Sequence, residues 1–495
     1  MTFEDDDGPV KLAEGTYDDV IVGTGLAASV LAAALAGDGR AVLHCDANGY
    51  YGDETATVPW RQLIQRLEKD PRYSAVSVDV PDDDDGSVDG NAYLFDLMPL
   101  VLYSRSDIVD ALVRSRSSNY LSFRCIERHF ALVDGRVVSV PMSRNDVFQS
   151  DCIDRADKRR LMKLMHVVMD GDRLATAPSN AMDRDLLGQY SDRPFREYLA
   201  AIGLSPMLQT FIIYSFCFDD GDTMSTDQGI AALKKFLMSM GRFDRGALLY
   251  PVYGTGDLPQ AFCRLAAVYG ATYLLRCAPN LTDDEMVLGG TDQRIDFQNV
   301  VTREVCDASS TDSVSRCICV SRVPIVDGVG ICMLAVPPDD PGQHAVRVLQ
   351  VDEASGCAPP GSYIIYLSTR QCDRARERIR GVLERVVTPA NRKRTVFFCE
   401  QRSSLIIQQS RKTCDTNQGG DLTAERKSRR RISVSGSSYL FDADDMVKEA
   451  RNAFEQLRPG SEFLRQRPGE DDDLDVDTRN NPEFCRIVTD DTNAV

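Results

Sequence analysis

The stretch that decides the fold is residues 17–46, YDDVIVGTGLAASVLAAALAGDGRAVLHCD. It begins with a short run, residues 19–22, of the kind that forms a buried strand. A turn with two glycines follows at 23–25, and residues 26–36 are rich in alanine and leucine, which favour a helix. Residues 41–46 have the pattern of a second strand. This order predicts the βαβ unit that opens a nucleotide-binding type of α/β domain.

The turn contains a dinucleotide-binding fingerprint, Gly23-x-Gly25-x-x-Ala28. The first glycine permits a tight turn, the second lets the backbone approach a pyrophosphate, and a small third residue allows close packing of helix on strand. Asp46 ends the second strand, where an acidic residue can hold a ribose hydroxyl. Taken alone, the motif favours an FAD or NAD site and a purely structural turn about equally.

The composition restricts the class of protein. The chain has 495 residues, of which 43% are hydrophobic, enough for a large core and for more than one domain. Its net charge of −18 argues against nucleic acid as a partner, because a phosphate binder needs a basic face. The first residues have no signal-peptide pattern, and the apolar stretch 211–218 is too short to span a bilayer. We therefore expect a cytoplasmic protein with reduced thiols.

The sequence does not indicate metal chemistry. The 15 cysteines are scattered, Cys317 and Cys319 form a lone C-x-C pair, and the four histidines form no metal-binding pattern. There is also no second glycine-rich dinucleotide motif and no C-x-x-C. We expect no metal site and no catalytic residue, although a bound flavin would supply its own chemistry.

Periodicity and composition divide the rest of the chain. After the βαβ unit, the pattern is mainly helical and then returns to strands, which predicts a large α/β domain with mixed sheets and an inserted all-helical domain. The α/β domain is predicted to comprise residues 1–104 and 226–465, with the helical insertion at 105–225 between them. Residues 409–438, within the second part, are predicted to form a disordered basic loop, and residues 466–495 an acidic tail.

Several segments resemble one known family. Residues 17–26 (YDDVIVGTGL), 42–46 (VLHCD) and 48–52 (NGYYG) are similar to the opening of the Rab GDP-dissociation inhibitor and Rab escort protein superfamily. Residues 250–264, YPVYGTGDLPQAFCR, resemble its Y-P-x-Y-G-x-G-E-L-P-Q-x-F-x-R block.

Two further segments resemble the escort branch of this superfamily more than the inhibitor branch. They are residues 143–148, SRNDVF, and residues 336–348, VPPDDPGQHAVRV. Two residues depart from the family pattern. Ala28 stands where many members have an acidic residue, and Asp257 stands where the family usually has glutamate, so its reach to a partner is shorter.

The resemblance implies a two-domain protein. The larger domain would be FAD-linked-reductase-like in fold, would carry a platform for GDP-bound Rab GTPases, and would hold no cofactor. The helical domain would bind the geranylgeranyl lipid on Rab and contact the Rab geranylgeranyltransferase heterodimer, with transient membrane contact. A Rab GDP-dissociation inhibitor and an FAD-dependent oxidoreductase remain as alternative functions.

The same resemblance assigns site residues. The Rab-binding platform would include Tyr51, Tyr253, Asp257, Gln260 and Arg264. Arginine can form a forked pair with a carboxylate, and tyrosine offers a ring with a polar tip. The alternative is that Asp257 caps the helix beginning near residue 258, with Arg264 simply solvated on that helix.

The lipid pocket would be lined by flexible apolar side chains, because methionine repacks readily around a ligand. Ordinary helix–helix core is an equally good interpretation of any one of them. The candidates are Met162, Met165, Met169, Ile212 and Phe216, with Phe211 as a transferase contact. The motif Arg429-Arg430-Arg431-Ile432-Ser433 has three interpretations: a kinase site at Ser433, a contact with membrane charge, or an ordinary disordered linker.

Overall fold

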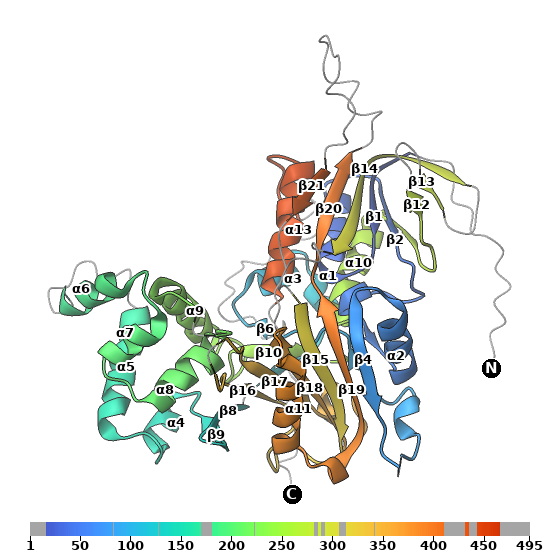
Figure 1. Ribbon diagram of the computed structural model, residues 1–495. Coiled ribbons are helices and arrows are strands. Elements are labelled where there is room, and N and C mark those ends of the chain that lie inside the picture. Colours follow the sequence, from blue (N-terminus) through green and yellow to red (C-terminus); the bar gives the residue numbers. More distant parts are fainter. Residues whose placement is uncertain are drawn as a thin grey trace, which may run out of the picture.

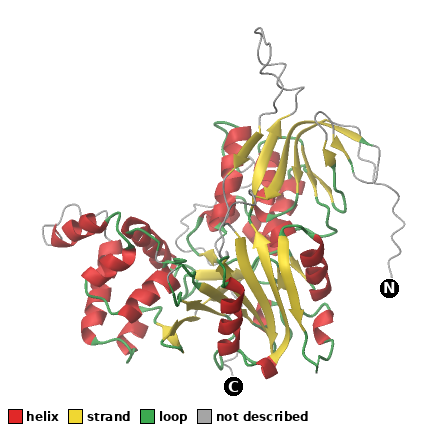
Figure 2. Cartoon of the chain, viewed as in Figure 1, coloured by secondary structure: helices red, strands yellow, loops and turns green. Residues whose placement is uncertain are grey.

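The computed structural model describes residues 16–82, 84–126, 128–169, 181–221, 223–281, 286–288, 293–305, 313–340, 342–409, 431–434 and 443–465. Two large mixed sheets with covering helices form one part of the protein, and a group of helices at the left of the view forms the other (Figure 1). The colouring by secondary structure in Figure 2 separates the two parts in the same way. The predicted fold class, a mixed α/β part and a helical part, is confirmed.

The first sheet is built around the predicted βαβ unit. Its strands run in the order β11-β2-β1-β14-β13-β12, with β20 paired to β14 and β21 paired to β20. Strand β1 is parallel to both β2 and β14, so its carboxyl end lies in the middle of the sheet edge. The strands are β1 Thr16–Val22, β2 Val42–Cys45, β11 Thr272–Leu274, β12 Asn280–Leu281, β13 Met286–Val287, β14 Arg294–Val305, β20 Ser403–Gln409 and β21 Arg431–Val434.

Helix α1 (Leu26–Gly37) is the central helix of this part. It contacts α10 (Asp257–Val268) and α13 (Asp444–Leu457), and its side chains from Leu26 to Ala36 are buried. Because most of these side chains are alanines, neighbouring elements can approach the helix closely. Ala28 is one of them, at 2% exposure, as expected for the small third position of the glycine motif.

The second sheet has the strand order β4-β19-β15-β18-β17-β16-β8-β9. Helix α11 (Ala375–Val386) packs against one face of it, and the other face is part of the largest core cluster, which extends into the helical part. The strands are β4 Tyr73–Asp79, β8 Arg128–Val133, β9 Arg136–Val140, β15 Ser313–Ser321, β16 Cys332–Val336, β17 Val346–Val351, β18 Tyr363–Arg370 and β19 Arg392–Gln401.

Short elements complete the α/β part. They are the small sheets β6-β10-β7 and β3-β5, the α-helices α2 and α3, and several one-turn 3-10 helices. Their bounds are β3 Thr57–Val58, β5 Phe95–Asp96, β6 Leu102–Tyr103, β7 Phe123–Ile126, β10 Leu248–Pro251, α2 Trp60–Lys69, α3 Asp107–Arg114, η1 Asp53–Thr55, η2 Ser87–Asp89, η3 Ser117–Tyr120, η6 Glu353–Ser355 and η7 Pro389–Asn391.

The helical part runs from α4 to α9, and both predicted boundaries, 105 and 225, come too early. Helix α3 packs on α13, and the strands β7 to β9 belong to the sheets, so residues 105–140 are part of the α/β fold. The strands β7 to β9 are only four to six residues long, so the mainly helical pattern of the surrounding segment obscures them. The helices are α4 Arg144–Gln149, α5 Arg155–Met169, α6 Ala181–Tyr190, α7 Phe195–Ala201, α8 Pro206–Thr210, the π-helix η5 Phe211–Phe216, and α9 Thr226–Ser239.

The predicted disordered loop also needs correction. Within residues 409–438, the backbone of β21 pairs with β20, with Ser433 opposite Ile406. Residues 410–430, 435–442 and the acidic tail 466–495 lie outside the described residues. Among the helices that the structure describes, none is long and apolar enough to cross a membrane.

Candidate functional site

The glycine turn before α1 is occupied by side chains of the protein itself. Asp46 Oδ2 accepts hydrogen bonds from Thr24 N at 2.8 Å and from Thr24 Oγ1 at 2.5 Å. Asp46 Oδ1 accepts from the backbone and side-chain amides of Asn48, both at 2.8 Å. Both carboxylate oxygens of Asp46, the residue predicted to hold a ribose hydroxyl, therefore hold the turn to the loop after β2.

The place that a pyrophosphate takes in a dinucleotide site is filled by η1. Leu26 N, at the start of α1, donates to Thr55 Oγ1 at 3.2 Å. A Cβ atom at Gly25 would overlap the Glu54 carboxylate, whereas Gly23 has the left-handed φ of +94° that the tight turn requires. The second glycine of the fingerprint therefore makes room for an internal carboxylate.

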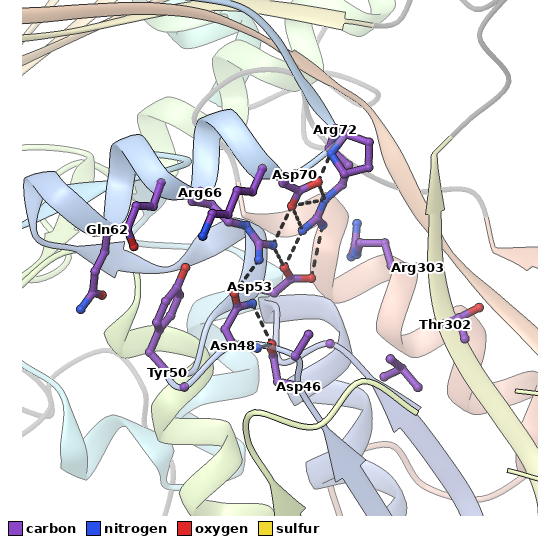
Figure 3. Close-up of a pocket in the computed structure, with 17 residues that line it drawn as sticks. Asp46, Asn48, Tyr50, Asp53, Gln62, Arg66, Asp70, Arg72, Thr302 and Arg303 are labelled. Carbon is purple, nitrogen blue, oxygen red and sulfur yellow. Dashed lines mark hydrogen bonds and ion pairs between the residues drawn. The ribbon is translucent and has the colours of Figure 1, made fainter. Parts of the chain in front are cut away.

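A cavity of about 800 Å³ lies beside this turn, at the carboxyl ends of β1 and β2 (Figure 3). Figure 3 shows Arg66 and Arg72 pointing toward Asp53 and Asp70. Arg72 Nη2 lies 2.6 Å from Asp53 Oδ1 and 2.8 Å from Asp70 Oδ2, and Arg66 also pairs with both carboxylates. These two arginines are thus neutralised within the protein.

Burial and neighbouring charges shift the pKa values of the two acids of η1, Asp53 and Glu54, in opposite directions. Burial alone would raise the pKa of Asp53, but Arg72 and Arg66 hold it below its ordinary value. Burial, opposed by Arg303 and assisted by the Asp53 charge, raises the pKa of Glu54 to about 7. Arg303 Nη2 lies 3.4 Å from Glu54 Oε1 and 3.4 Å from Glu449 Oε2, so the acid cluster also connects β14 with α13.

Four of the predicted platform residues meet at one cavity of about 390 Å³. It lies over α10, and two tyrosines that the sequence did not indicate also line it. The residues concerned are Tyr51, Asp257, Gln260 and Arg264 from the prediction, together with Tyr120 and Tyr273. Tyr253 is not among the residues that line this cavity; it is 58% exposed and has a left-handed φ of +71°.

The two additional tyrosines fix the orientation of the predicted side chains. The Arg264 guanidinium lies 4.1 Å from the centre of the Tyr120 ring, which is a cation–π arrangement. Tyr51 packs edge to face on Tyr273 with the ring centres 5.8 Å apart. Because Tyr120 comes from η3 and Tyr273 from β11, no spacing in the sequence connects them with α10.

Asp257 does not cap α10. Gly256 occupies the N-cap position and Asp257 is the first helical residue, so the capping interpretation was wrong. Burial and, to a smaller extent, the nearby Asp96 together raise the pKa of Asp257 to about 6. The carboxyl group lies in the cavity wall, where a partner that supplies a positive charge or a hydrogen-bond donor would favour its ionised form.

A third cavity, which is apolar and has a volume of about 450 Å³, lies in the helical part. Four predicted lipid-pocket residues line it: Met162, Met165, Met169 and Phe216. Other residues in its wall that the sequence did not indicate come from the loop before α4, from α4 and from α9. They include Met142, Val147, Phe236, Leu237 and Met240.

Two candidates of the helical part do not have the predicted positions. Ile212 is fully buried and is not among the residues that line the apolar cavity. Phe211 is 2% exposed, so its ring packs in the core and offers no surface to a transferase. Both residues belong to the π-helix η5, whose side chains are all buried, and of these only Phe216 lines the apolar cavity.

The described residues contain no group of three or more histidine, cysteine, aspartate or glutamate side chains that would hold a metal ion. The cavity over α10 presents charged and aromatic groups, and the cavity in the helical part presents thioethers and rings.

Comparisons relate these features to known proteins. A family model described as "GDI: GDP dissociation inhibitor" matches residues 13–390. Rab proteins geranylgeranyltransferase component A 1 of Rattus norvegicus is 30% identical over 426 residues, 82% of this chain and 64% of the rat protein. The chain thus spans less than two thirds of the rat protein's length.

Two other comparisons cover nearly the whole chain. Rab proteins geranylgeranyltransferase component A of Drosophila melanogaster is 27% identical over 485 residues, 91% of this chain and 90% of the fly protein. The crystal structure of a Rab GDI from Plasmodium falciparum has a TM-score of 0.64 at 18% identity, and the match covers 90% of this chain and 98% of that one. The latter shows that the fold is shared.

Proposed function

Because this chain belongs to the GDP dissociation inhibitor family, we propose that it acts as a Rab escort protein. In this role it binds newly made, GDP-bound Rab GTPases, presents them to Rab geranylgeranyltransferase, and carries the prenylated Rab to membranes. The names of the rat and fly relatives, both component A of that transferase, support this role over the others.

The observation that carries the proposal is the presence of two separate binding sites of different chemistry. The cavity over α10 combines a carboxyl group, an arginine and three tyrosines, a set suited to a protein surface. The cavity in the helical part is lined by methionines and aromatic rings, which suit a flexible hydrocarbon chain. An escort needs both, because it holds the GTPase and its lipid at the same time.

The protein itself supplies no catalytic group in this proposal. Its contribution to prenyl transfer is positional: it raises the effective concentration of the Rab tail at the transferase active site. We assign the transferase contact to the exposed basic face of α5, which includes Arg155, Arg159 and Lys163, in place of the buried Phe211. Membrane contact would be transient, made when the prenylated Rab is delivered.

A flavin-dependent oxidoreductase fits the glycine turn less well. Asp46 is saturated by Thr24 and Asn48, and Glu54 lies where the phosphates of a dinucleotide would approach Gly25. The proposal therefore includes the absence of a flavin. The purified protein should be colourless, and denaturation should release no FAD; a yellow protein would favour the oxidoreductase.

The experiment that tests the main proposal combines purified transferase, a Rab and geranylgeranyl pyrophosphate, with and without this protein. Prenylation should depend on its presence, and the protein with Rab and pyrophosphate alone should give no product. A protein that binds only prenylated Rab and never stimulates its modification would instead be a Rab GDP-dissociation inhibitor, the second candidate within the same family.

A further inference from the structure

Arg347 is the largest side chain that the structure buries completely. It lies on β17, where Val346 and Val348 belong to the core cluster on the α11 side and Leu349 to the cluster shared with the helical part. Side chains alternate along a strand, so Arg347 faces the helical part together with Leu349. A buried guanidinium requires partners for its donors, and the identity of those partners indicates what the side chain holds.

The guanidinium holds the end of the π-helix η5. Arg347 Nη1 donates to the carbonyl oxygen of Tyr214, and Nη2 donates to the carbonyl oxygen of Asp219. Its central carbon lies 5.1 Å from the centre of the Phe218 ring. One side chain of the sheet thus binds two carbonyls and one ring in the last turn of η5 and the residues after it.

This segment has a backbone conformation that needs support. Cys217 N donates to Ile212 O at 2.9 Å, the five-residue spacing of a π-helix, which is rare in proteins. Phe218 then has a left-handed φ of +52°, which is unfavourable for a bulky side chain. Because Arg347 binds carbonyls on both sides of Phe218, it opposes relaxation of that turn.

The same segment determines where Phe216 lies. Phe216 lines the apolar cavity and stacks on Phe236 with the ring centres 4.7 Å apart. It is separated from Phe218 by a single residue, so a shift at the end of η5 displaces the Phe216 ring. Ala345 N also donates to Asp220 O at 2.6 Å, which attaches the segment to the sheet at a second point.

We infer that Arg347 is a positioning residue for the apolar cavity: by holding the Tyr214 and Asp219 carbonyls, it keeps Phe216 in the cavity wall and so preserves the shape that retains a hydrocarbon chain. The inference rests on the proposed function, in which this cavity binds the geranylgeranyl group. The alternative is that Arg347 contributes only to overall stability, as any buried arginine does.

The test uses a Rab carrying an NBD-labelled geranylgeranyl group and measures its release from the full-length protein. Arg347→Met should bind unprenylated Rab within about twofold of wild type, because the cavity over α10 is unchanged. It should release the labelled lipid about tenfold faster than wild type, since networks of this kind modulate distant sites by such factors. Arg347→Lys should be intermediate, because an ammonium group lacks the forked geometry that binds two carbonyls.

The matched control is Arg316, which lies in the same row of the sheet, two strands away. Arg316 is 3% exposed, pairs with Glu400 at 2.5 Å and donates to Ser368 Oγ, and neither of these partners belongs to η5. Arg316→Met combined with Glu400→Gln should lower the melting temperature and leave lipid release at the wild-type rate. Equal acceleration by the control, or a wild-type release rate in Arg347→Met, overturns the inference.

A measurement on the wild-type protein covers the case in which Arg347→Met does not fold. Hydrogen exchange of the amides between Phe211 and Asp220, and of Arg347 on β17, should slow together when the labelled, prenylated Rab binds. Protection of the cavity wall without protection of these amides contradicts the inference. If the wild-type protein does not retain prenylated Rab at all, the proposed function fails instead, so the two failures are distinguishable.

Discussion

Replacing Glu54 by glutamine should stabilise the protein at neutral to alkaline pH. The Glu54 carboxyl group is buried at 3% exposure against Gly25, and its pKa is about 7 instead of the ordinary 4.5, chiefly because burial disfavours the charge. At about 1.4 kcal/mol for each pH unit between the two values, the ionised group costs about 3 kcal/mol of folding free energy above pH 7. Glutamine keeps the shape, carries no charge, and can donate a hydrogen bond to Asp53.

The direction of this pH dependence follows from proton binding. Since the folded state holds the Glu54 proton to a higher pH than the unfolded state does, this group lowers the free energy of unfolding as pH rises from about 4.5 to about 7. The gain from Glu54→Gln should therefore be small at pH 5, increase through pH 6 and 7, and level off by pH 8. Other acids with raised pKa values, such as Asp257, contribute equally to both proteins and cancel in the difference.

The assay is urea unfolding at pH 5, 6, 7 and 8, followed by the fluorescence of Trp60. This is the only tryptophan of the chain, it is 4% exposed, and it begins α2, near the acid cluster. Glu68→Gln on the exposed face of the same helix is the control and should change stability by less than about 0.5 kcal/mol at any pH. A stability difference that does not increase with pH, or a Glu54→Gln protein that is less stable at pH 8, would refute the reasoning.

Three further predictions concern the binding sites. Arg264→Ala and Tyr51→Ala should each weaken Rab binding by about 1 kcal/mol or more, because both are proposed as interface anchors. The circular dichroism spectrum and the melting temperature should not change. A wild-type affinity in titration calorimetry would show that these residues are ordinary surface residues. Phe216→Asp should impair retention of prenylated Rab in a vesicle-extraction assay, because a charge in an apolar cavity is strongly disfavoured, while unprenylated Rab still binds. A folded variant that extracts prenylated Rab normally would exclude Phe216 from the lipid site. Arg159→Glu with Lys163→Glu should abolish stimulation of the transferase and preserve Rab binding, and unchanged stimulation would assign the contact to another surface.

The βαβ unit and its glycine turn could be predicted because every signal for them is local. Residues 16–46 contain the strands, the turn and the helix in chain order, and the observed bounds differ from the predicted ones by only a few residues. The content of the turn could not be predicted. Whether Glu54 or a phosphate lies against Gly25 depends on how η1 folds back over α1, and nothing in the spacing of the sequence indicates that return.

The residues that line the lipid cavity could also be predicted only in part from the sequence. Met162, Met165 and Met169 lie three and four residues apart, so an α-helix places them on one side, and the cavity indeed lies there. Phe211 and Ile212 are candidates because residues 207–218 are apolar almost all round and because of the family resemblance. Neither signal specifies which way a side chain points, and the structure places both residues in a π-helix. Arg347, which donates to the Tyr214 carbonyl of this π-helix and to the Asp219 carbonyl after it, is more than 100 residues distant and belongs to a strand of the sheet.

The contacts of the glycine turn give Gly25 a different structural role from the one that its sequence motif suggests. In a dinucleotide-binding protein a glycine at position 25 would be required by the approaching phosphate, and its presence would be evidence for the cofactor. Here the same residue is required by Glu54, because any side chain at Gly25 would overlap the carboxylate. The arginine beside the turn, Arg72, is still paired with negative charge. That charge is supplied by Asp53, Glu54 and Asp70 of the chain itself. At this turn, carboxylates of the chain thus lie where the phosphates of a dinucleotide would otherwise approach.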